Sequence, residues 1–464
     1  MKLNPMIGLE IHVQLMTKTK MYCRCSTDSN DPNSNCCPVC YGLPGALPIP
    51  NKKALELASK CGYLLNCDLN NESIPERKNY FYPDLPKGYQ ISQFSKPVGE
   101  GGEWFFYCEN KECKVSIKRI QVEEDTAQLL VKGNNSFLDF NRSGMPLLEI
   151  VTDPEFSSSK EAGEFLRSLR SSLIEHGISS GKMETGAMRC EPNVSVSING
   201  KISNKVEIKN LGSISGVEKA IKWEIEDQLN RISLGEKVES VTKGWDEDNH
   251  ECVLQRVKES ASDYRYFPEP DLNVLLSHEK TFQKKTPYEK MKEMLQDGVS
   301  YQMARSISLN HKVFEYYSSF PAGLDRKVLS SWITGSLMSL WKENPDILGL
   351  SPKKEELFKL IKFLQDGEIT NSIAKKILPQ ITLENKSLDS LIQKMGPTAY
   401  LPDEALLALV KKIIKENPEI INKYLNGKTS VLKSLIGLGM RKSKGRAEPK
   451  RLEKELEEFL KSYK

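Results

Sequence analysis

The sequence of 464 residues lacks long apolar runs, a large excess of one charge and the pattern of an export signal. No apolar run approaches the roughly 18 residues that a membrane-spanning helix needs. Lys and Arg (66) barely outnumber Asp and Glu (62), so composition alone does not predict a polyanionic partner. The opening residues MKLNP show neither the apolar core of a signal peptide nor the Arg- and Ser-rich pattern of a transit peptide. We therefore expect a globular, cytoplasmic protein with about two or three domains.

The cysteines are informative through their spacing. Eleven cysteines without an export signal fit a reducing compartment better than a disulfide framework. Five of them fall within eighteen residues: Cys23, Cys25, Cys36, Cys37 and Cys40. A C-x-C pair and a C-x-x-C pair on two turns can bring four thiolates onto one tetrahedral zinc, and Cys37, not Cys36, gives the second spacing. We expect a structural zinc at Cys23, Cys25, Cys37 and Cys40; buried, uncharged thiols are the alternative.

The first part of the chain, up to about residue 284, has the pattern of a large sheet. Residues 7–14, 114–122 and 193–198 alternate in polarity or carry β-branched side chains, with Gly, Pro and Asn between these segments. Two helices are predicted to interrupt them, at 159–176, where apolar residues recur at helical spacing, and at 216–234. We expect an α+β domain built on an antiparallel sheet.

After residue 284 proline becomes sparse, and Lys, Glu, Leu and Ile dominate. Helical apolar spacing at 328–338 and 355–364 predicts an all-helical region. Gly396-Pro397 is a break within it, because Asp403 opens a new amphipathic helix that continues through Ile414. The sequence thus predicts three domains, at 1–284, 285–397 and 398–464.

Groups that could bind a metal gather at two places in the predicted strands. Glu10 and His12 are two residues apart, so their side chains lie on the same face of a strand and could reach one metal. Glu123, Glu124 and Asp125 form an acidic run. Adjacent like charges are costly to bury unless a cation neutralises them, and oxygen-rich clusters suit Mg²⁺. A solvated acidic turn is the alternative.

Other acids and one loop are less informative. Glu191 and Asp246-Glu247 lie near strand-like segments, and neither is informative by itself. Residues 177–182, GISSGK, are similar to a phosphate-binding loop but are one residue short, and neither Ser nor Thr follows Lys182. A nucleoside triphosphate would therefore lie on a sheet with a carboxylate-held metal, not on a P-loop.

Two aromatic stretches and one basic stretch suit nucleotides. Residues 78–84 and 263–271 combine Tyr and Phe with basic residues, which can stack on nucleotides or RNA ends; packed turns with buried Tyr are the alternative. Residues 440–446, MRKSKGR, are predicted to form a basic loop before an acidic helix at 451–460. Such a loop can contact a phosphate backbone, or it can be a solvated hairpin.

Several segments together resemble one family, the B subunit of the tRNA-dependent aspartyl/glutamyl-tRNA(Asn/Gln) amidotransferase. The similar segments are IGLEIHVQ (7–14), NYFYPDLPKGYQISQF (79–94), PLLEIVTDP (146–154), EIKNL (207–211), DYRYFPEPDL (263–272), GEITNSIAKK (367–376), YLNGK (424–428) and KSKGRAEPK (442–450). The resemblance covers essentially the whole chain and is weakest between about 273 and 366. It implies a cradle domain, a helical domain and a small helical tail that grips tRNA.

The resemblance also implies an activity, that of a carbon–nitrogen ligase with glutamine as amido donor. Members of the family bind mischarged Glu-tRNA(Gln) or Asp-tRNA(Asn), phosphorylate the side-chain carboxylate with ATP and Mg²⁺, and let ammonia displace the phosphate. The ammonia comes from a separate amidase (glutaminase) subunit, and a small third subunit clamps the two in a heterotrimer. The chain contains no recognisable glutaminase site, which fits that division of labour.

Family roles can be carried over to the matching positions of this chain. The implied Mg²⁺ ligands are Glu10, His12 and Glu123, and Glu124, Glu191 and Glu247 would complete the catalytic site directly or through water. The implied ATP-binding residues are Lys78, Arg142 and Lys209. The cysteine set, Cys23, Cys25, Cys37 and Cys40, matches a zinc site that some members have. The implied tRNA contacts are Arg441, Lys442, Lys444 and Arg446.

The chain departs from the family pattern at three places. Where the family usually reads H-x-E-E-D-A-G-K, residues 121–128 read QVEEDTAQ, so a His, a Gly and a Lys are missing. Glu191 stands where Asp is usual, and Gly212 where Asn is common. The missing Lys and Gly, in Thr126-Ala127-Gln128, leave open a non-catalytic protein of the same complex that only binds tRNA or supports assembly. A zinc-ribbon RNA-binding protein outside the family would explain the cysteines and the basic tail but not the acidic cluster.

Overall fold

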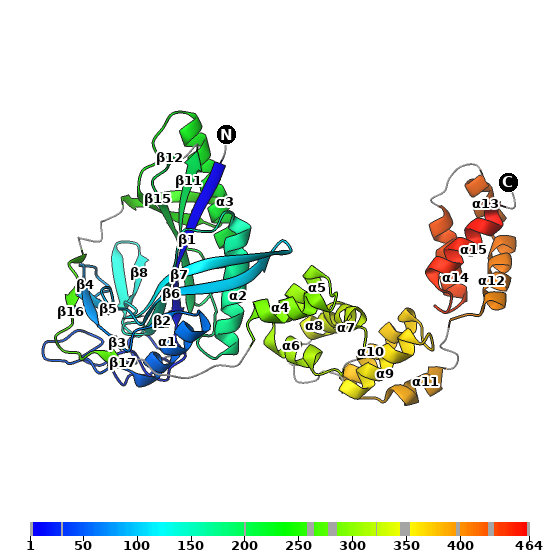
Figure 1. The fold of residues 1–464 in the computed structure, drawn as a ribbon, viewed down its shortest axis with the longest axis horizontal. Coiled ribbons are helices and arrows are strands. Elements are labelled where there is room, and N and C mark those ends of the chain that lie inside the picture. Colours follow the sequence, from blue (N-terminus) through cyan, green and yellow to red (C-terminus); the bar gives the residue numbers. More distant parts are fainter. Residues whose placement is uncertain are drawn as a thin grey trace. The chain divides into compact units, whose positions relative to one another are not determined.

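Strand β1 (Leu3–Gln14) runs through the middle of a ten-stranded sheet (Figure 1). The strand order is β15-β14-β13-β11-β1-β10-β7-β6-β2, with β12 paired to β11. All neighbours are antiparallel except β13 and β14, which are parallel. The other strands are β2 (Asp68–Leu69), β6 (Gly99–Cys108), β7 (Lys111–Glu124), β10 (Pro146–Thr152), β11 (Met188–Ile198), β12 (Lys201–Ile202), β13 (Val206–Lys209), β14 (Val241–Asp246) and β15 (Glu251–Val257). The predicted α+β class with an antiparallel sheet is confirmed.

The computed structural model describes residues 3–28, 31–198, 201–257, 264–276, 285–321, 323–343, 353–395, 400–425 and 431–461. By its contacts the chain divides into two units, residues 1–290 and 291–464. The expected domain boundary at 284 and the expected break at Gly396-Pro397 lie outside the described residues. The division into three domains therefore stays a prediction.

Three small sheets accompany the large one in the first unit. They are β16 (Phe267–Pro268), β4 (Glu76–Asn79) and β5 (Tyr89–Ser92); β17 (Leu275–Leu276) with β3 (Glu72–Ser73); and the hairpin β8 (Gln128–Lys132) and β9 (Asn135–Asp139). The β16-β4-β5 sheet lies on the opposite side of the large sheet from α2 and α3 (Figure 1). It therefore borders the face of the large sheet that the helices leave open.

Three helices cover the other face: α1 (Lys52–Leu64), α2 (Ser159–Glu175) and α3 (Ile214–Ser233). Helix α2 begins where the Ser158 hydroxyl accepts a hydrogen bond from the Glu161 backbone N–H, 3.2 Å away. Its core-facing residues recur at helical spacing and are fully buried: Ala162, Phe165, Leu166, Leu169 and Leu173. Helix α2 packs on β6, and α3 packs on β11. The helices predicted at 159–176 and 216–234 are confirmed to within two residues.

Strand alternation divides the sheet into an apolar and a polar face. On β1, Leu9, Ile11 and Val13 are at most 1% exposed and belong to the core under the helices. The alternate residues Glu10 and His12 lie on the opposite face because successive side chains point to opposite sides. The neighbouring strands add Glu149 of β10 and Arg189 and Glu191 of β11 opposite these two residues, so this face collects titratable side chains.

The second unit is helical. Its helices are α4 (Pro287–Gln296), which crosses the boundary between the units, α5 (Tyr301–Ser308), α6 (His311–Ser318), α7 (Arg326–Trp332), α8 (Met338–Glu343), α9 (Lys354–Gln365), α10 (Asn371–Leu383), α11 (Leu388–Met395), α12 (Asp403–Glu416), α13 (Pro418–Leu425), α14 (Leu432–Lys442) and α15 (Pro449–Lys461). The helix predicted at 328–338 is interrupted by a π-helical turn, Ile333–Leu337. Helices α12, α14 and α15 share one apolar core. Within the described ranges, every helix is too short or too polar to span a bilayer.

Candidate active site

The polar face of the sheet carries a cluster of acids around one histidine, called the acidic cluster below: Glu10, His12, Glu123 and Glu149. The strand register brings them together. Strand β1 places His12 opposite Glu149 of β10, and β7, on the other side of β10, places Glu123 opposite Leu147, two residues from Glu149 and on the same face. His12 Nε2 lies 3.3 Å from Glu123 Oε1 and 3.7 Å from Glu10 Oε1. One ligand atom each of Glu10, His12 and Glu149 lie within 4.8 Å of one another. This spacing suits a single metal ion.

The electrostatics of the acidic cluster favour a cation. Burial and the neighbouring charge of Glu10 raise the pKa of Glu123 to about 7, although Lys78 opposes the shift. Burial, Glu10 and Glu123 raise the pKa of Glu149 to about 8. Glu123 and Glu149 thus retain protons to higher pH than an ordinary carboxyl group, because burial and the neighbouring acids disfavour their charged forms. Carboxylate oxygens with one imidazole are a donor set for Mg²⁺ or Mn²⁺, so these residues fit the implied metal.

Sequence reasoning missed Glu149 as a member of this cluster. It is 4% exposed, and its neighbours in β10, PLLEIVT, are apolar. A single acid inside an apolar strand was the signal available, because burying an unpaired carboxylate is costly. The residue lies in a segment, 146–154, that already carried the resemblance, but nothing in the sequence alone shows that it faces His12.

The other two acids of the 123–125 run point elsewhere. Glu124 pairs with Lys87 and accepts a hydrogen bond from the Ile91 backbone N–H at 3.0 Å. Asp125 binds Arg142 and Arg189, with Arg189 Nη2 3.0 Å from its Oδ1. Although burial opposes it, these two guanidinium groups hold the pKa of Asp125 below its usual value. Glu124 and Asp125 therefore form ion pairs beside the acidic cluster, and the catalytic role expected for Glu124 stays a prediction.

Glu191 and Glu247 differ in position. Glu191 is paired with Glu10 across β1 and β11, and Lys209 Nζ lies 2.8 Å from its Oε2. Glu247 has a side chain that is 59% exposed, and its described contacts are Lys219 and Trp245. Glu191 thus borders the acidic cluster. The role expected for Glu247 stays a prediction.

The three cations expected to bind ATP each face an acid. Arg142 pairs with Asp125, and Lys209 pairs with Glu191. Burial is the largest single effect and disfavours the charged form of Lys78, but the combined fields of Glu123, Tyr266, Glu149 and Tyr80 outweigh it and raise the pKa of Lys78. A cation that is already charged beside buried acids can move to a phosphate without changing protonation state.

The two aromatic stretches meet beside the acidic cluster. Strand β16 pairs with β4, with Phe267 opposite Arg77. Tyr80 and Tyr264 meet edge to face with ring centroids 6.0 Å apart, and Lys78 Nζ lies 4.9 Å from the Tyr264 ring centroid. Residue 263, which opens the second stretch, lies outside the described residues. The two stretches therefore form one aromatic and basic wall.

The four predicted zinc ligands converge. Their four Sγ atoms, from Cys23, Cys25, Cys37 and Cys40, all lie within 4.8 Å of one another. This cysteine cluster can therefore bind a metal. Cys36 is directed away, and its Sγ lies 3.6 Å from Asn141 Oδ1. Four cysteine sulfurs are a typical ligand set for tetrahedral Zn²⁺, so the cluster fits the zinc ion that the resemblance implies.

A buried lysine supports the cysteine cluster. Lys20 is fully buried and donates a hydrogen bond to Cys40 Sγ at 3.2 Å and another to the Phe140 carbonyl at 3.1 Å. A hydrogen bond from Cys23 is the main cause that lowers the pKa of the Cys40 thiol to about 4, and Lys20 adds to it. Sequence reasoning did not identify Lys20. An ammonium group at this position offsets part of the negative charge of four thiolates.

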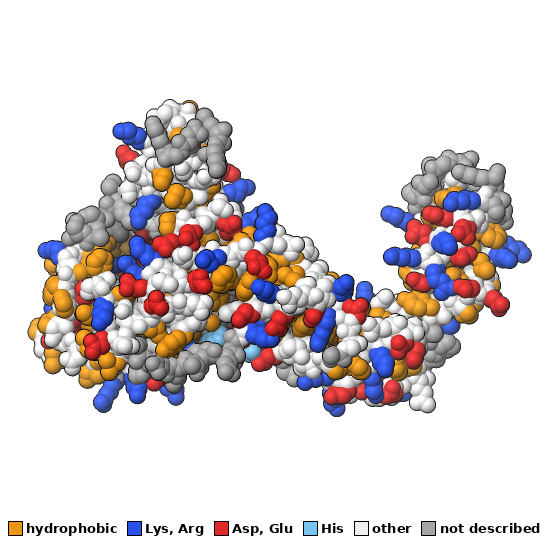
Figure 2. Space-filling model, in the orientation of Figure 1, with side chains coloured by type: hydrophobic (Ala, Val, Ile, Leu, Met, Phe, Trp, Pro, Cys, Tyr) orange, Lys and Arg blue, Asp and Glu red, His pale blue; other side chains and the backbone are white. Residues whose placement is uncertain are grey.

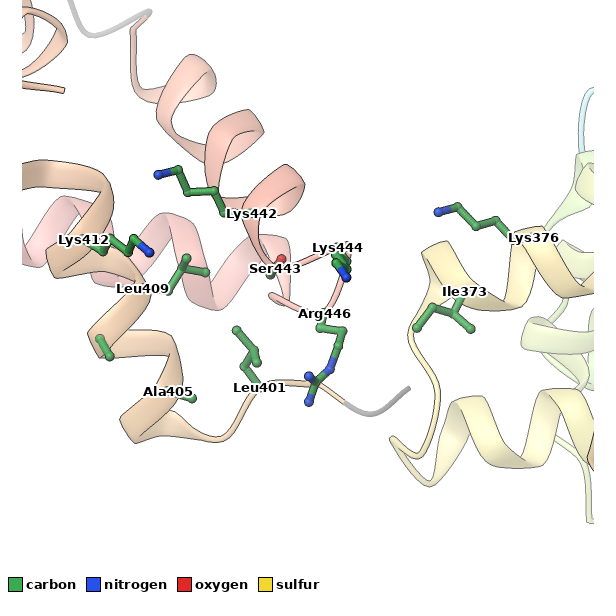
Figure 3. Close-up of a pocket in the computed structure, with 11 residues that line it drawn as sticks. Ile373, Lys376, Leu401, Ala405, Leu409, Lys412, Lys442, Ser443, Lys444 and Arg446 are labelled. Carbon is green, nitrogen blue, oxygen red and sulfur yellow. The ribbon is translucent and has the colours of Figure 1, made fainter. Parts of the chain in front are cut away.

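The basic residues of the tail lie partly in a helix. Arg441 and Lys442 form the last turn of α14, where cations interact favourably with the helix dipole, so the prediction of a loop across 440–446 was wrong for these two. Lys444 follows with φ of 54°, in the turn that ends the helix. Lys412 of α12 lines the same pocket as Lys442, Lys444 and Arg446 (Figure 3). Sequence reasoning missed Lys412 because it lies about thirty residues away in the chain.

Comparisons with known proteins agree with this architecture. The family model described as "GatB/GatE catalytic domain" matches residues 5–283, and that described as "GatB domain" matches residues 314–460. Proteins named as the B subunit of aspartyl/glutamyl-tRNA(Asn/Gln) amidotransferase are similar over nearly their whole length. That of Clostridium tetani is 39% identical over 99% of both chains, and that of Thermotoga maritima 38% over 99% of both. That of Roseiflexus castenholzii is 37% identical over 98% of both. The chain therefore belongs to the B-subunit family of the aspartyl/glutamyl-tRNA(Asn/Gln) amidotransferases, and its general role is that of one component of a tRNA-dependent amidotransferase.

Proposed function

We propose that this chain is the carboxylate kinase and amide-forming component of a cytoplasmic heterotrimer with an amidase (glutaminase) partner and a small clamp partner. Its substrates would be mischarged Glu-tRNA(Gln), Asp-tRNA(Asn) or both, with ATP. The observation that carries the proposal is the convergence of Glu10, His12 and Glu149 at metal-ligating spacing, with Glu123 3.3 Å from His12.

The chemistry requires activation of a carboxylate. A carboxylate is a poor acyl donor because its leaving group would be oxide. The proposed first step joins a carboxylate oxygen of the aminoacyl group to the γ-phosphorus of ATP and releases ADP. Ammonia then attacks the acyl carbon, phosphate leaves, and the amide forms. When bound, Mg²⁺ would screen the triphosphate charge.

The residues of the chain divide this work by position. Glu10, His12, Glu123 and Glu149 would hold the cation, and Glu191 borders them across the strand pair. Lys78, Arg142 and Lys209 would exchange their acid partners for ATP phosphates. The aromatic wall offers stacking surfaces for a base. The cysteine cluster would hold a structural zinc, and the tail cations would contact the tRNA backbone.

A non-catalytic assembly protein of the same complex is the second candidate, because the Lys expected at position 128 is Gln. The altered segment is nevertheless held in place, since Thr126 Oγ1 donates to Asp84 Oδ2 at 3.0 Å and the Ala127 N–H donates to the Asp84 carbonyl at 2.9 Å. ADP release that depends on mischarged tRNA, measured with the amidase and clamp partners present, separates the two candidates. Tight tRNA binding without ADP release would favour the assembly role.

Glu149→Gln should lower tRNA-dependent ADP release by about 100-fold or more, because a metal ligand contributes several kcal/mol of transition-state stabilisation. Binding of tRNA should stay unchanged. The matched control is Glu103→Gln, which removes an exposed acid of β6 that pairs with Lys114. Normal turnover in Glu149→Gln would exclude the acidic cluster as the metal site. Glu247→Gln, measured alongside, tests the role predicted for that outlying residue.

The stability of the metal-free chain should fall as the pH rises from about 5 to about 8. The pKa values of Glu123 (about 7) and Glu149 (about 8) exceed the ordinary 4.5, so the folded state binds more protons than the unfolded state in this interval. Added Mg²⁺ replaces these protons and should raise the melting temperature more at about pH 8 than at about pH 6. Equal shifts at both pH values, or an unchanged pattern in Glu149→Gln, would contradict this account.

Zinc should copurify with the chain and be lost more readily from Cys40→Ser and Lys20→Met than from the wild type. Cys36→Ser is the matched control, because its Sγ bonds Asn141 and not the cysteine cluster, and it should retain zinc. Metal content after dialysis against a chelator measures the difference. Equal zinc loss from Cys36→Ser and Cys37→Ser would show that the ligand choice is wrong.

Replacing Lys444 and Arg446 by Ala should weaken tRNA binding and flatten its dependence on salt. Each lost phosphate contact should reduce the slope of log affinity against log salt by about 0.7 to 0.9. Lys412→Ala should behave similarly, because it lines the same pocket. Lys454→Ala is the control, since Lys454 lies 3.8 Å from Glu458 on the exposed side of α15. An unchanged slope in all variants would mean that these cations are only solvated.

A further inference from the structure

Gln121 lies directly against the acidic cluster. It is the residue of β7 that faces Glu149 of β10, and the two side chains are 3% and 4% exposed. Gln121 Nε2 donates a hydrogen bond to Glu149 Oε2 at 2.6 Å. When Glu149 is ionised, as a metal ligand must be, an amide oxygen in the same place would repel its carboxylate. The orientation in which the amide donates is therefore the favourable one.

The second N–H of the same amide reaches another acid of the cluster through a serine. Gln121 Nε2 lies 3.3 Å from Ser92 Oγ, and the Ser92 hydroxyl donates to Glu123 Oε2 at 3.4 Å. The neutral side chain of Gln121 is therefore hydrogen-bonded directly to Glu149 and, through Ser92, indirectly to Glu123. Both N–H groups are used, whereas the buried Oε1 of Gln121 has no hydrogen-bond partner among the described residues.

Arg119 is another donor near Glu149. Its Nη2 lies 4.0 Å from Glu149 Oε1, beyond hydrogen-bond distance, and its side chain is 27% exposed. It contributes charge and does not fix the carboxylate geometrically. A guanidinium held closer would also compete with a bound cation, whereas the amide of Gln121 orients the carboxylate without adding positive charge.

We propose that Gln121 is the positioning residue of the acidic cluster: its amide holds the Glu149 carboxylate directly, and the Glu123 carboxylate through Ser92, in the orientation that binds a divalent cation. The inference rests on the proposed function, which makes these acids metal ligands. Partners of this kind around a metal typically change metal affinity by about 10- to 100-fold when removed.

The test is Mn²⁺ binding to the full chain, followed by electron paramagnetic resonance without ATP or tRNA. Gln121→Met keeps the length of the side chain and removes both donors, and it should weaken Mn²⁺ binding by about 10- to 100-fold. Ser92→Ala should cause a smaller loss, because only the connection to Glu123 is removed. Gln121→His, which restores one N–H donor, should recover most of the affinity.

Gln90→Met is the matched control, because Gln90 is also buried and its amide donates to the backbone carbonyl of Glu124 and not to the acidic cluster. It should leave Mn²⁺ affinity unchanged even if it lowers the melting temperature. Wild-type affinity in a folded Gln121→Met overturns the proposal. If Gln121→Met does not fold, Ser92→Ala decides: reduced affinity supports the proposal, and unchanged affinity overturns it. A wild-type chain that binds no Mn²⁺ overturns the proposed metal site as well, and the wild-type titration alone reveals that result.

Discussion

The register of β1 between β10 and β11 is the constraint on which the rest of this structure depends. It places Glu10 opposite Glu191 and His12 opposite Glu149, while Ile11 remains in the core beneath the helices. A slip of one residue would bury the charged face and expose the apolar face, because side chains alternate with period two. The cost of burying unpaired acids against α2 and α3 therefore specifies the register and, with it, the candidate active site.

Charge compensation is the second theme of the polar face. Asp125 and Glu191 have cationic partners at hydrogen-bond distance and pKa values below the usual range. Glu123 and Glu149 lack such direct compensation and retain protons instead. The difference separates acids that organise the surroundings from acids that are suited to a metal. On the face that Figure 2 shows, acidic and basic side chains are interspersed, in keeping with a net charge of only +4.

Cations are also placed beside negative groups at the cysteine cluster and in the tail. Lys20 brings one ammonium group to four sulfurs inside the protein, where a charge without a partner would be costly. In the tail, Arg441 and Lys442 lie at the carboxyl end of α14, where the helix dipole favours them, and Lys442 also pairs with Glu416 of α12. Both arrangements place cations where a negative group, a metal-thiolate centre or a phosphate, would meet them.

Local pattern was enough for several features. Alternation predicted strand 7–14 and placed Glu10 and His12 on one face, helical spacing predicted α2, and pair spacing selected Cys37 over Cys36. These features are encoded within a few residues, so a single segment carries the full signal. The motifs that carried the family resemblance added the activity and the partners, which no local pattern contains.

Other features needed the tertiary structure, because they depend on strand pairing between distant segments. Glu149 joins His12 from more than one hundred residues away, Gln121 reaches Glu149 from the next strand, and Lys412 meets the end of α14 across a helix pair. Packing also places Glu124 against Lys87 and leaves Glu247 exposed beside Lys219, and the catalytic roles expected for these two acids stay predictions. The sequence by itself determined which side chains share a strand face. Register and packing decided which faces meet, because the energy that selects them comes from burial and pairing across the whole sheet.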